Sequence, residues 1–204
     1  MRGEHISARP KDICEVIFDM IGYAFCGSFC TISESLKQLQ ALVERGLDIV
    51  PIMSERVYST DTRFFAAEEL RRRVKLITGR EIVHTVEGAE PFGPKPLESL
   101  IIAPCTGNTL AKLSLGITDT AVTMAAKAHM RADGKILIAL ASNDAMSQNL
   151  KSLGMLITRR SLYFVPMKQD NPVAKPHSLV ADMSRICEAY DAMLDNRQLR
   201  PLFI

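Results

Sequence analysis

The sequence lacks long hydrophobic runs and has almost no excess of charge of either sign. No apolar stretch approaches the roughly 18 to 20 residues that a membrane-spanning helix requires, so we expect no insertion into a bilayer. The net charge is only +2, with 25 Lys and Arg against 23 Asp and Glu mixed along the chain. This balance gives no reason to expect nucleic acid or an anionic membrane as a partner.

The sequence also lacks a regular cysteine pattern. Its five cysteines are odd in number and widely spaced, and no cleavable apolar leader precedes them. These features favour a reduced, cytoplasmic compartment over a disulfide-bonded secreted protein. Cys26 and Cys30 are not accompanied by a His or Cys pair at metal-binding spacing, so we expect ordinary thiols and no metal site.

The length and composition predict one domain. A chain of 204 residues with 47% hydrophobic and 24% charged residues can bury one substantial core. Residues 1–15 are mostly polar at their start and carry Arg9-Pro10, so we predict an N-terminal extension without chemistry. Residues 16–204 are predicted to form the domain.

Apolar runs and helical periodicities alternate along the chain. The predicted strands cover residues 16–25, 47–53, 100–103, 135–141 and 161–165. Helices are predicted between them, at 36–45, 64–77, 107–116, 119–131, 148–159 and 178–194. This alternation predicts an α/β fold, a single doubly wound parallel sheet of Rossmann-like type covered on both faces.

The segment from residue 100 to residue 111 is the most informative stretch. A buried strand stops at Pro104, and Thr106, Gly107, Asn108 and Thr109 then open a helix. Such a turn leaves the first helical amides unpaired, points the positive end of the helix dipole outward and lets a glycine bring the backbone close to an anion. The alternative is that these residues only stop a strand and cap a helix.

Small polar residues follow three other predicted strands. Gly27-Ser28, Ser54 and Ser142-Asn143 each stand where a strand ends. Because the carboxyl ends of adjacent parallel strands meet at one edge of a sheet, we predict that these turns and the Pro104–Thr109 turn form one anion-binding crevice. A plain helix cap is the alternative interpretation of Gly27-Ser28.

The polar loop at residues 54–64 is longer than a minimal connection between a strand and a helix. Asp61 and Arg63, with the neighbouring hydroxyls, could hold a substrate carboxylate. Alternatively, the loop only caps the following helix. The sequence does not single out a catalytic residue, and the candidates are Asn108, Asp61 and Arg63.

Two linked motifs resemble a known superfamily. Pro104–Thr109 resembles the P-A-S-A-N-T and P-C-S-x-x-T signatures of the flavin-dependent cysteine decarboxylases and flavin prenyltransferases, and residues 115–122 resemble their G-I-x-D-N-L helix start. The resemblance implies a flavoprotein fold with FMN, whose phosphate the Gly27-Ser28 turn would hold. The catalytic histidine of the decarboxylases would fall on Glu90, and His84 lies six residues earlier.

Further loop motifs resemble one family within that superfamily, the B subunits of dipicolinate synthases of spore-forming bacteria. They are residues 58–64, 89–95, 142–145 and 163–166, with Gln169-Asp170 and Lys175-Pro176. The resemblance implies NADP-linked oxidation of dihydrodipicolinate to dipicolinate, a small dicarboxylate, in the cytoplasm of the mother cell during sporulation. It also implies a partner, the A subunit of such a synthase, that brings the dinucleotide-binding domain, and this chain has no G-x-G-x-x-G after a strand.

Some alternatives stay open at this point. FMN could be bound, lost or replaced by substrate in the same crevice. The chain could instead be an FMN-dependent decarboxylase of a cysteine-derived acid, which Asn108 favours, or a non-catalytic scaffold or regulatory protein of the same fold. We also expect a homo-oligomer.

Overall fold

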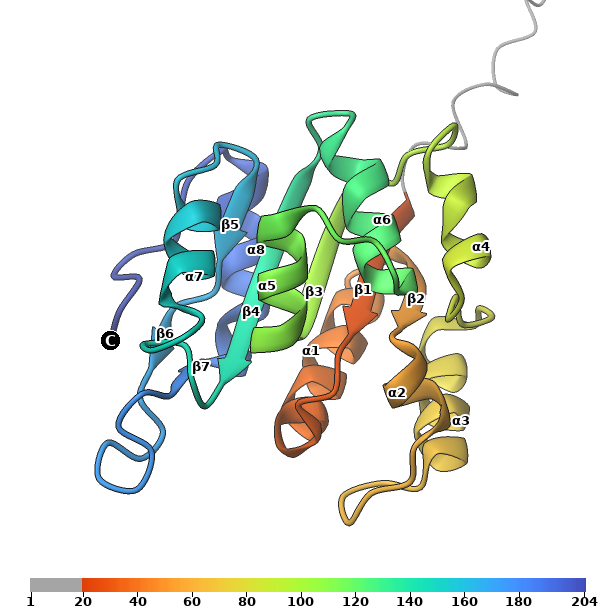
Figure 1. The fold of residues 1–204 in the computed structure, drawn as a ribbon. Helices are drawn as coiled ribbons and strands as arrows, with labels where there is room; N and C mark the ends of the chain where they lie inside the picture. Colours follow the sequence, from red (N-terminus) through yellow and green to blue (C-terminus); the bar gives the residue numbers. More distant parts are fainter. Residues whose placement is uncertain (1–19) are drawn as a thin grey trace, which may run out of the picture.

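Seven strands in residues 20–204, the part of the chain that the computed structural model describes, form one mostly parallel sheet (Figure 1). They are β1 (Met20–Phe25), β2 (Asp48–Met53), β3 (Ser99–Thr106), β4 (Lys135–Ser142), β5 (Leu162–Phe164), β6 (Met167–Lys168) and β7 (Leu179–Ala181). The order is β2-β1-β3-β4, after which β5 pairs with the first half of β4 and β7 with its end. The predicted N-terminal extension lies outside the described residues.

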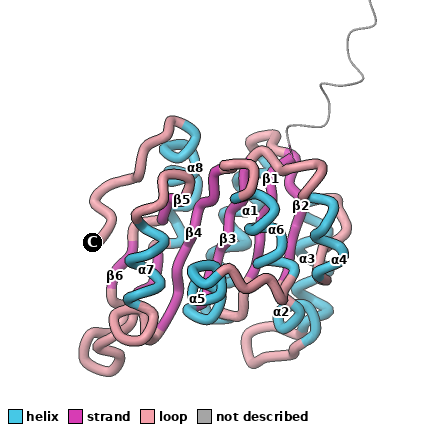
Figure 2. Tube along the Cα trace, turned by 45° about the horizontal axis from the view of Figure 1, so that its top comes forward, coloured by secondary structure: helices cyan, strands magenta, loops and turns pink. Residues whose placement is uncertain are grey.

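Helices cover both faces of the sheet (Figure 2). They are α1 (Ile32–Glu44), α2 (Glu55–Ser59), α3 (Ala67–Thr78), α4 (Val86–Ala89), α5 (Gly107–Leu115), α6 (Ala121–Met130), α7 (Leu150–Ile157) and α8 (Ile186–Leu194), with short 3-10 turns η1 (Phe29–Thr31), η2 (Glu90–Phe92) and η3 (Met183–Arg185). One apolar core lies under α1, α3 and α8, and a second lies under α5, α6 and α7. None of these helices is long and apolar enough to cross a membrane.

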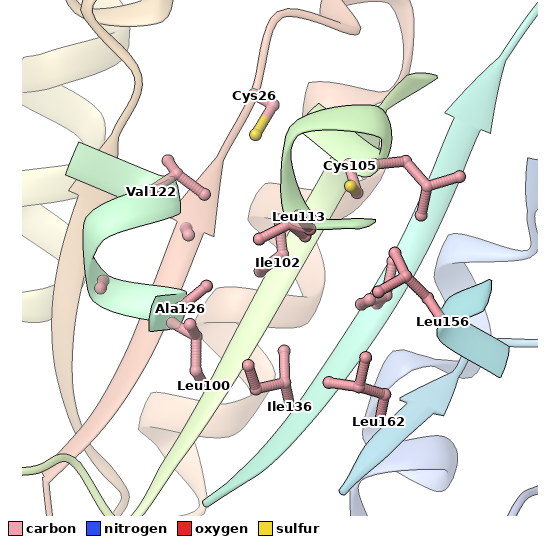
Figure 3. Packing of buried hydrophobic residues seen from close by; sticks show 14 of the residues in the cluster. Cys26, Leu100, Ile102, Cys105, Leu113, Val122, Ala126, Ile136, Leu156 and Leu162 are labelled. Carbon is pink, nitrogen blue, oxygen red and sulfur yellow. The ribbon is translucent and has the colours of Figure 1, made fainter. Parts of the chain in front are cut away.

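The central strands are apolar on both faces because each face meets a helical layer. On β3, Leu100 and Ile102 pack toward α5 and α6, whereas Ile101 and Ala103 belong to the core on the other face (Figure 3). All four side chains are fully buried. This explains why the strands appear in the sequence as continuous apolar runs rather than as alternating patterns.

The carboxyl-terminal part of the sheet differs from the prediction. Residues 178–194 do not form one helix, because Leu179–Ala181 is strand β7 and the α-helix begins only at Ile186. Asp182 separates the two elements, since its carboxylate accepts a hydrogen bond from the Ser184 amide and starts a 3-10 turn. Strand β7 runs antiparallel to β4 and β6, so the sheet is not entirely parallel.

Pro104 does not end its strand, contrary to the prediction. Strand β3 continues to Thr106, and its register against β4 shifts between Ile102 and Cys105. Proline cannot donate a ladder hydrogen bond, so an irregularity in the pairing accommodates it. The Pro104 carbonyl still accepts a bond of 3.1 Å from the Cys26 amide, which ties the ends of β1 and β3 together.

His129 is buried near the start of β4, at the end of the sheet opposite the carboxyl ends of β1 and β3. His129 lies in the last turn of α6, and its Nε2–H donates to the Lys135 carbonyl at 3.0 Å. Its Nδ1 has no hydrogen-bond partner among the described residues. Gly134 leaves the space for the ring, because a Cβ there would lie 2.6 Å from His129 Cδ2 and closer still to Nε2. Burial lowers the pKa of His129 below its ordinary value.

This lowered pKa makes folding stability depend on pH. Below the unfolded-state pKa of about 6.5, the unfolded chain binds a proton at His129 before the folded chain does, so the free energy of unfolding falls as the pH falls. We expect a loss of at most about 1.4 kcal/mol per pH unit from this group, between about pH 7 and the folded-state pKa. Urea unfolding at a series of pH values measures it. A His129→Gln variant that retains the same pH slope would contradict the assignment.

Candidate functional site

The predicted strand-end turns converge at the carboxyl edge of the sheet. They line a crevice of about 660 Å³, the main crevice, whose walls include Gly27, Ser28, Thr106, Gly107, Ser142 and Asn143. These residues end or directly follow β1, β3 and β4. After β1 the chain adds β2 on one side and β3 on the other, so the main crevice lies at the topological switch point, where open α/β sheets bind ligands.

A second space adjoins the main crevice and shares Gly27 and Thr106 with it. This side hollow of about 450 Å³ is lined by Ser54, Asn108 and Thr109, with Arg56 and Lys112 among the charged residues. The ten predicted cofactor-binding residues are therefore divided between two adjoining spaces. Pro104 is the exception, because it is buried inside β3 and lines neither space.

The turns after β3 and β4 pack closely against each other at Gly107. A Cβ on Gly107 would lie 2.7 Å from Asn149 Nδ2 and 2.9 Å from Asp144 Oδ1, and closer still to Ser142 Oγ. These three residues form a network, in which Ser142 Oγ donates to Asp144 Oδ1 at 2.5 Å and Asn149 Nδ2 donates to Asp144 Oδ2 at 2.8 Å. A side chain at 107 would therefore have to displace these three side chains and disturb their hydrogen bonds.

At the start of α5, Thr106 caps the helix, whereas the Asn108 side chain is exposed to solvent. Thr106 Oγ1 accepts from the Thr109 amide at 3.2 Å and donates to Thr109 Oγ1 at 3.1 Å. Its hydroxyl proton is thus used within the turn, as the capping alternative predicts. Asn108 is exposed beside it, and the amides of Gly107 and Asn108 begin the helix, where no preceding carbonyl can accept them.

The turn after β1 is held by its own backbone and by Thr31. The Ser28 amide donates to the Cys26 carbonyl at 2.8 Å, and Thr31 Oγ1 donates to the Ser28 carbonyl at 2.9 Å. A Cβ on Gly27 would meet nothing closer than Phe29 Cε2 at 3.5 Å, an ordinary contact. Packing within the protein does not require a glycine at 27, in contrast to Gly107.

The two candidates in the polar loop have different places in the structure. Asp61 Oδ1 accepts from the Ala67 amide at 2.7 Å and so caps α3, and Asp61 lines neither the main crevice nor the side hollow. This contact agrees with the capping alternative, and a role of Asp61 toward a substrate stays a prediction. Arg63 lines the main crevice, and its guanidinium lies over the Phe64 ring at 4.8 Å.

Several charged residues line the site that the sequence does not predict as site residues. Lys175 and Asp170 line the main crevice as an ion pair at 2.7 Å, and Lys112 pairs with Asp119 beside the side hollow at 2.8 Å. The pKa of Asp170 is lowered chiefly by its hydrogen bond from Lys175, and that of Asp119 by its bond from Lys112. The partners of each pair are only five and seven residues apart, but it is the folding of their loops that brings the charges together at the site.

Two arginines at the site have no such partner. Within residues 20–204, neither Arg63 in the main crevice nor Arg56 in the side hollow lies within 4.0 Å of a carboxylate oxygen. Arg56 follows Ser54 by two residues, at the start of α2. Each space therefore carries one guanidinium that is free to bind an anionic group.

Two of the cysteines near the site are buried, and the two candidate positions for a decarboxylase histidine lie away from the main crevice. Cys26 and Cys105 are buried, and burial raises the pKa of Cys26 to about 11 and also raises that of Cys105, so both are neutral thiols. His84 stacks on Tyr58 at 3.6 Å between ring centroids, and Glu90 is exposed at the start of η2. In residues 20–204 no three His, Cys, Asp or Glu side chains group closely enough to hold a metal ion.

The doubly wound sheet with a ligand-sized crevice at its switch point defines an α/β flavoprotein fold. The chain belongs to the Flavoprotein family, whose model matches residues 18–186. It is similar to the B subunit of dipicolinate synthase from Bacillus subtilis (strain 168), with 36% identity over 185 residues, 90% of this chain and 92% of that protein. The predicted resemblance to this family is thereby confirmed.

Solved structures agree with this assignment. The crystal structure of the dipicolinate synthase B subunit from Bacillus halodurans C matches with a TM-score of 0.83 and 39% identity, covering 91% of this chain and 96% of that one. An FMN-dependent cysteine decarboxylase, SpaF, matches with a TM-score of 0.63 and 19% identity over 87% of this chain and 96% of that one. At that identity the second match shows the shared fold alone.

The contacts around Gly107 predict the effect of a single methyl group. We expect Gly107→Ala to destabilise the protein by about 1–3 kcal/mol, because the new Cβ overlaps Ser142, Asp144 and Asn149. Chemical denaturation measures the change. The double variant Gly107→Ala/Ser142→Ala removes the closest overlapping atom and should recover part of the loss.

Gly27→Ala is the matched control, since the same methyl group meets only ordinary contacts there. We expect it to change the free energy of unfolding by less than about 0.5 kcal/mol. Equal losses from the two alanine substitutions would show that the Gly107 contacts do not determine the stability of the turn.

Proposed function

We propose that this chain is the B subunit of a dipicolinate synthase and that its main crevice and side hollow together bind the substrate, with or without a flavin. The observation that carries the proposal is the similarity to B subunits, which extends over about nine tenths of the chain. The proposed reaction is the NADP-linked oxidation of dihydrodipicolinate to dipicolinate during sporulation, in the cytoplasm of the mother cell. The proposed partner is the A subunit of the synthase, which would carry NADP.

The polar groups of the crevice suit a phosphate or a carboxylate. The exposed Asn108 side chain and the free amides at the start of α5 lie at the boundary between the two spaces. The combined spaces have the size of a typical cofactor or metabolite site. These residues fit FMN, whose phosphate the turns could hold and whose ring system could accept or relay electrons when it is bound.

The free guanidiniums suit a dicarboxylate. Arg63 in the main crevice and Arg56 in the side hollow each have donors that no carboxylate of the described chain occupies. A guanidinium binds a carboxylate through two parallel hydrogen bonds, which fixes the orientation of the substrate as well as its affinity. We propose that Arg63 binds one substrate carboxylate and that Arg56 or Asn108 binds the other acidic group.

Oxidation of dihydrodipicolinate removes a hydride and a proton and leaves an aromatic ring. The hydride goes to NADP⁺ on the A subunit, and the proton goes to a base of the complex. Aromatisation makes the step favourable. In this division of labour the residues of this chain bind and orient the dicarboxylate, so that its reacting carbon faces the nicotinamide of the partner.

The alternative of a decarboxylase acting on a cysteine-derived acid has less support. The position that would carry the catalytic histidine holds Glu90, which is exposed at the start of η2 and lines neither space of the site. The similarity to SpaF shows the fold alone. Asn108 favours this second function, but it suits the dicarboxylate of the proposed function equally well.

The exposed position of Asn108 predicts a loss of binding without a loss of folding. We expect Asn108→Ala to weaken binding of FMN or dipicolinate roughly tenfold, because a hydrogen bond to a charged group contributes about 1.5–3 kcal/mol and Asn108 has no structural contact to lose. Fluorescence titration with FMN and calorimetry with dipicolinate measure the affinity. Unchanged affinity for both ligands would remove Asn108 from the site.

Reconstitution with the A subunit tests the proposed function. The mixture should produce dipicolinate absorbance from dihydrodipicolinate and NADP⁺, and Arg63→Gln should raise KM more than it lowers kcat if Arg63 binds the substrate uniformly. Arg73→Gln on α3, an exposed arginine outside the site, is the matched control and should leave both constants unchanged. Full activity of the isolated A subunit, without this chain, would contradict an enzymatic role for this chain.

A further inference from the structure

The connection between β6 and β7 brings a lysine to the main crevice. This connection, residues 169–178, projects beyond the carboxyl end of β4, where the strand-end turns lie (Figure 1). We call it the lysine loop. Lys175 and Asp170 in this loop line the main crevice, to which Arg63 comes from the polar loop before α3. Two cations from different loops therefore line the same space.

Hydrogen bonds within the lysine loop and to its neighbour fix its backbone. The Lys175 amide donates to the Asn171 carbonyl at 2.8 Å, and the Ala174 amide donates to Asn171 Oδ1 at 2.9 Å. The loop is also tied to the turn after β4, because the Met146 amide donates to the His177 carbonyl at 2.9 Å. The backbone that carries Lys175 is thus held at the edge of the main crevice.

Asp170 holds the charged end of Lys175. Its Oδ2 accepts from Lys175 Nζ at 2.7 Å, and its Oδ1 accepts from the Ser178 hydroxyl at 2.6 Å. Ser178 is fully buried, so it fixes the Asp170 carboxylate from inside the fold. The bond between Asp170 and Lys175 lowers the pKa of Asp170 and raises that of Lys175, so both groups are charged at neutral pH.

The Lys175 ammonium keeps donors for a ligand. An ammonium has three N–H donors, and Asp170 is the single acceptor of Lys175 Nζ within residues 20–204. The Lys175 side chain is 45% exposed, so the remaining donors are open to solvent at the wall of the main crevice. Because an exposed ion pair contributes little to stability, the bond to Asp170 leaves room for a second role of the lysine.

We infer that Lys175 is a further substrate-binding residue, whose ammonium binds the carboxylate that Arg63 also binds in the main crevice. The inference rests on the proposed function, which places a dicarboxylate there. A carboxylate has about four acceptor positions on its two oxygens, so it can accept from a guanidinium and an ammonium together. Asp170 keeps the ammonium near the main crevice before the substrate arrives, and the free donors then bind the substrate.

Dipicolinate binding to the full chain tests the inference. Calorimetry at low and at high ionic strength measures the affinity of wild type, Lys175→Met and Lys175→Arg. We expect Lys175→Met to bind about tenfold more weakly and with a smaller salt dependence than wild type, because it keeps the aliphatic chain and loses the charge. Lys175→Arg keeps the charge and should retain most of the affinity.

Lys37→Met is the matched control. Lys37 on α1 forms an ion pair with Glu34 at 2.7 Å, the same distance as in the pair of Lys175 with Asp170, and it lines neither the main crevice nor the side hollow. We expect its affinity for dipicolinate to match that of wild type. Thermal unfolding reports whether each variant is folded.

Asp170→Asn distinguishes substrate binding from a structural role of Lys175. We expect this variant to bind dipicolinate at least as tightly as wild type, because it keeps the ammonium and removes a negative charge beside the dianion. If Lys175 acts only by holding its loop through Asp170, both Asp170→Asn and Lys175→Met should lose affinity to the same extent. That result would overturn the inference.

A double-mutant cycle tests whether Lys175 and Arg63 bind the same carboxylate. The loss of binding free energy in Arg63→Gln/Lys175→Met should be smaller than the two single losses combined, because groups that share a partner do not act independently. Additive losses would place the two cations on different groups of the ligand and would also overturn the inference.

The remaining outcomes separate the inference from the proposed function. If wild type binds dipicolinate and Lys175→Met binds it equally tightly, the inference is wrong and the proposed function stands. If Lys175→Met loses affinity for FMN and keeps its affinity for dipicolinate, Lys175 belongs to a flavin phosphate, and the inference is again wrong. If wild type binds no dipicolinate, the inference fails. If the mixture with the A subunit also forms no dipicolinate, the proposed function fails with it.

Discussion

The close approach of two neighbouring turns at Gly107 is the constraint on which the site depends. Ser142, Asp144 and Asn149 occupy the space that any side chain at 107 would need. Their hydrogen bonds fix the turn after β4 where it packs against the start of α5, and Gly107 lines the main crevice at that point. The network thus fixes the start of α5 relative to the turn after β4.

Some charged residues of the site are paired with an opposite charge, and others are not. Lys175 is paired with Asp170 and Lys112 with Asp119, and such exposed pairs contribute little to stability. Their effect is to leave Arg63 and Arg56 as the unpaired cations among the described residues of the site. A net charge of +2 conceals this distribution, because paired and unpaired charges count equally in the sum.

Much of the fold could be predicted because local patterns determine it. Continuous apolar runs marked the central strands, and the polar turn at Thr106–Asn108 marked the carboxyl edge of β3. Strand β7 was missed because Leu179, Met183 and Ile186 also match helical spacing, and only its pairing with neighbouring strands makes it a strand.

The candidate site was predicted in part for the same reason. Strand-end residues could be grouped because parallel strands bring their ends together. Asp144 and Asn149 are partners of Gly107 because two segments far apart in the sequence meet. The capping role of Asp61 and the pairing of Lys175 with Asp170 depend on how their own loops fold. Glycine at 107 was expected for approach to a ligand, whereas the structure gives it a packing reason.

The central claim is that the crevice at the ends of β1, β3 and β4 is the ligand site. A crystal structure of the wild-type protein with dipicolinate tests it most directly. We expect the dicarboxylate to lie between the Gly27-Ser28 turn and the start of α5, with Arg63 or Arg56 within hydrogen-bond distance of one of its carboxylates. A ligand bound elsewhere, with the crevice filled only by water, would contradict it.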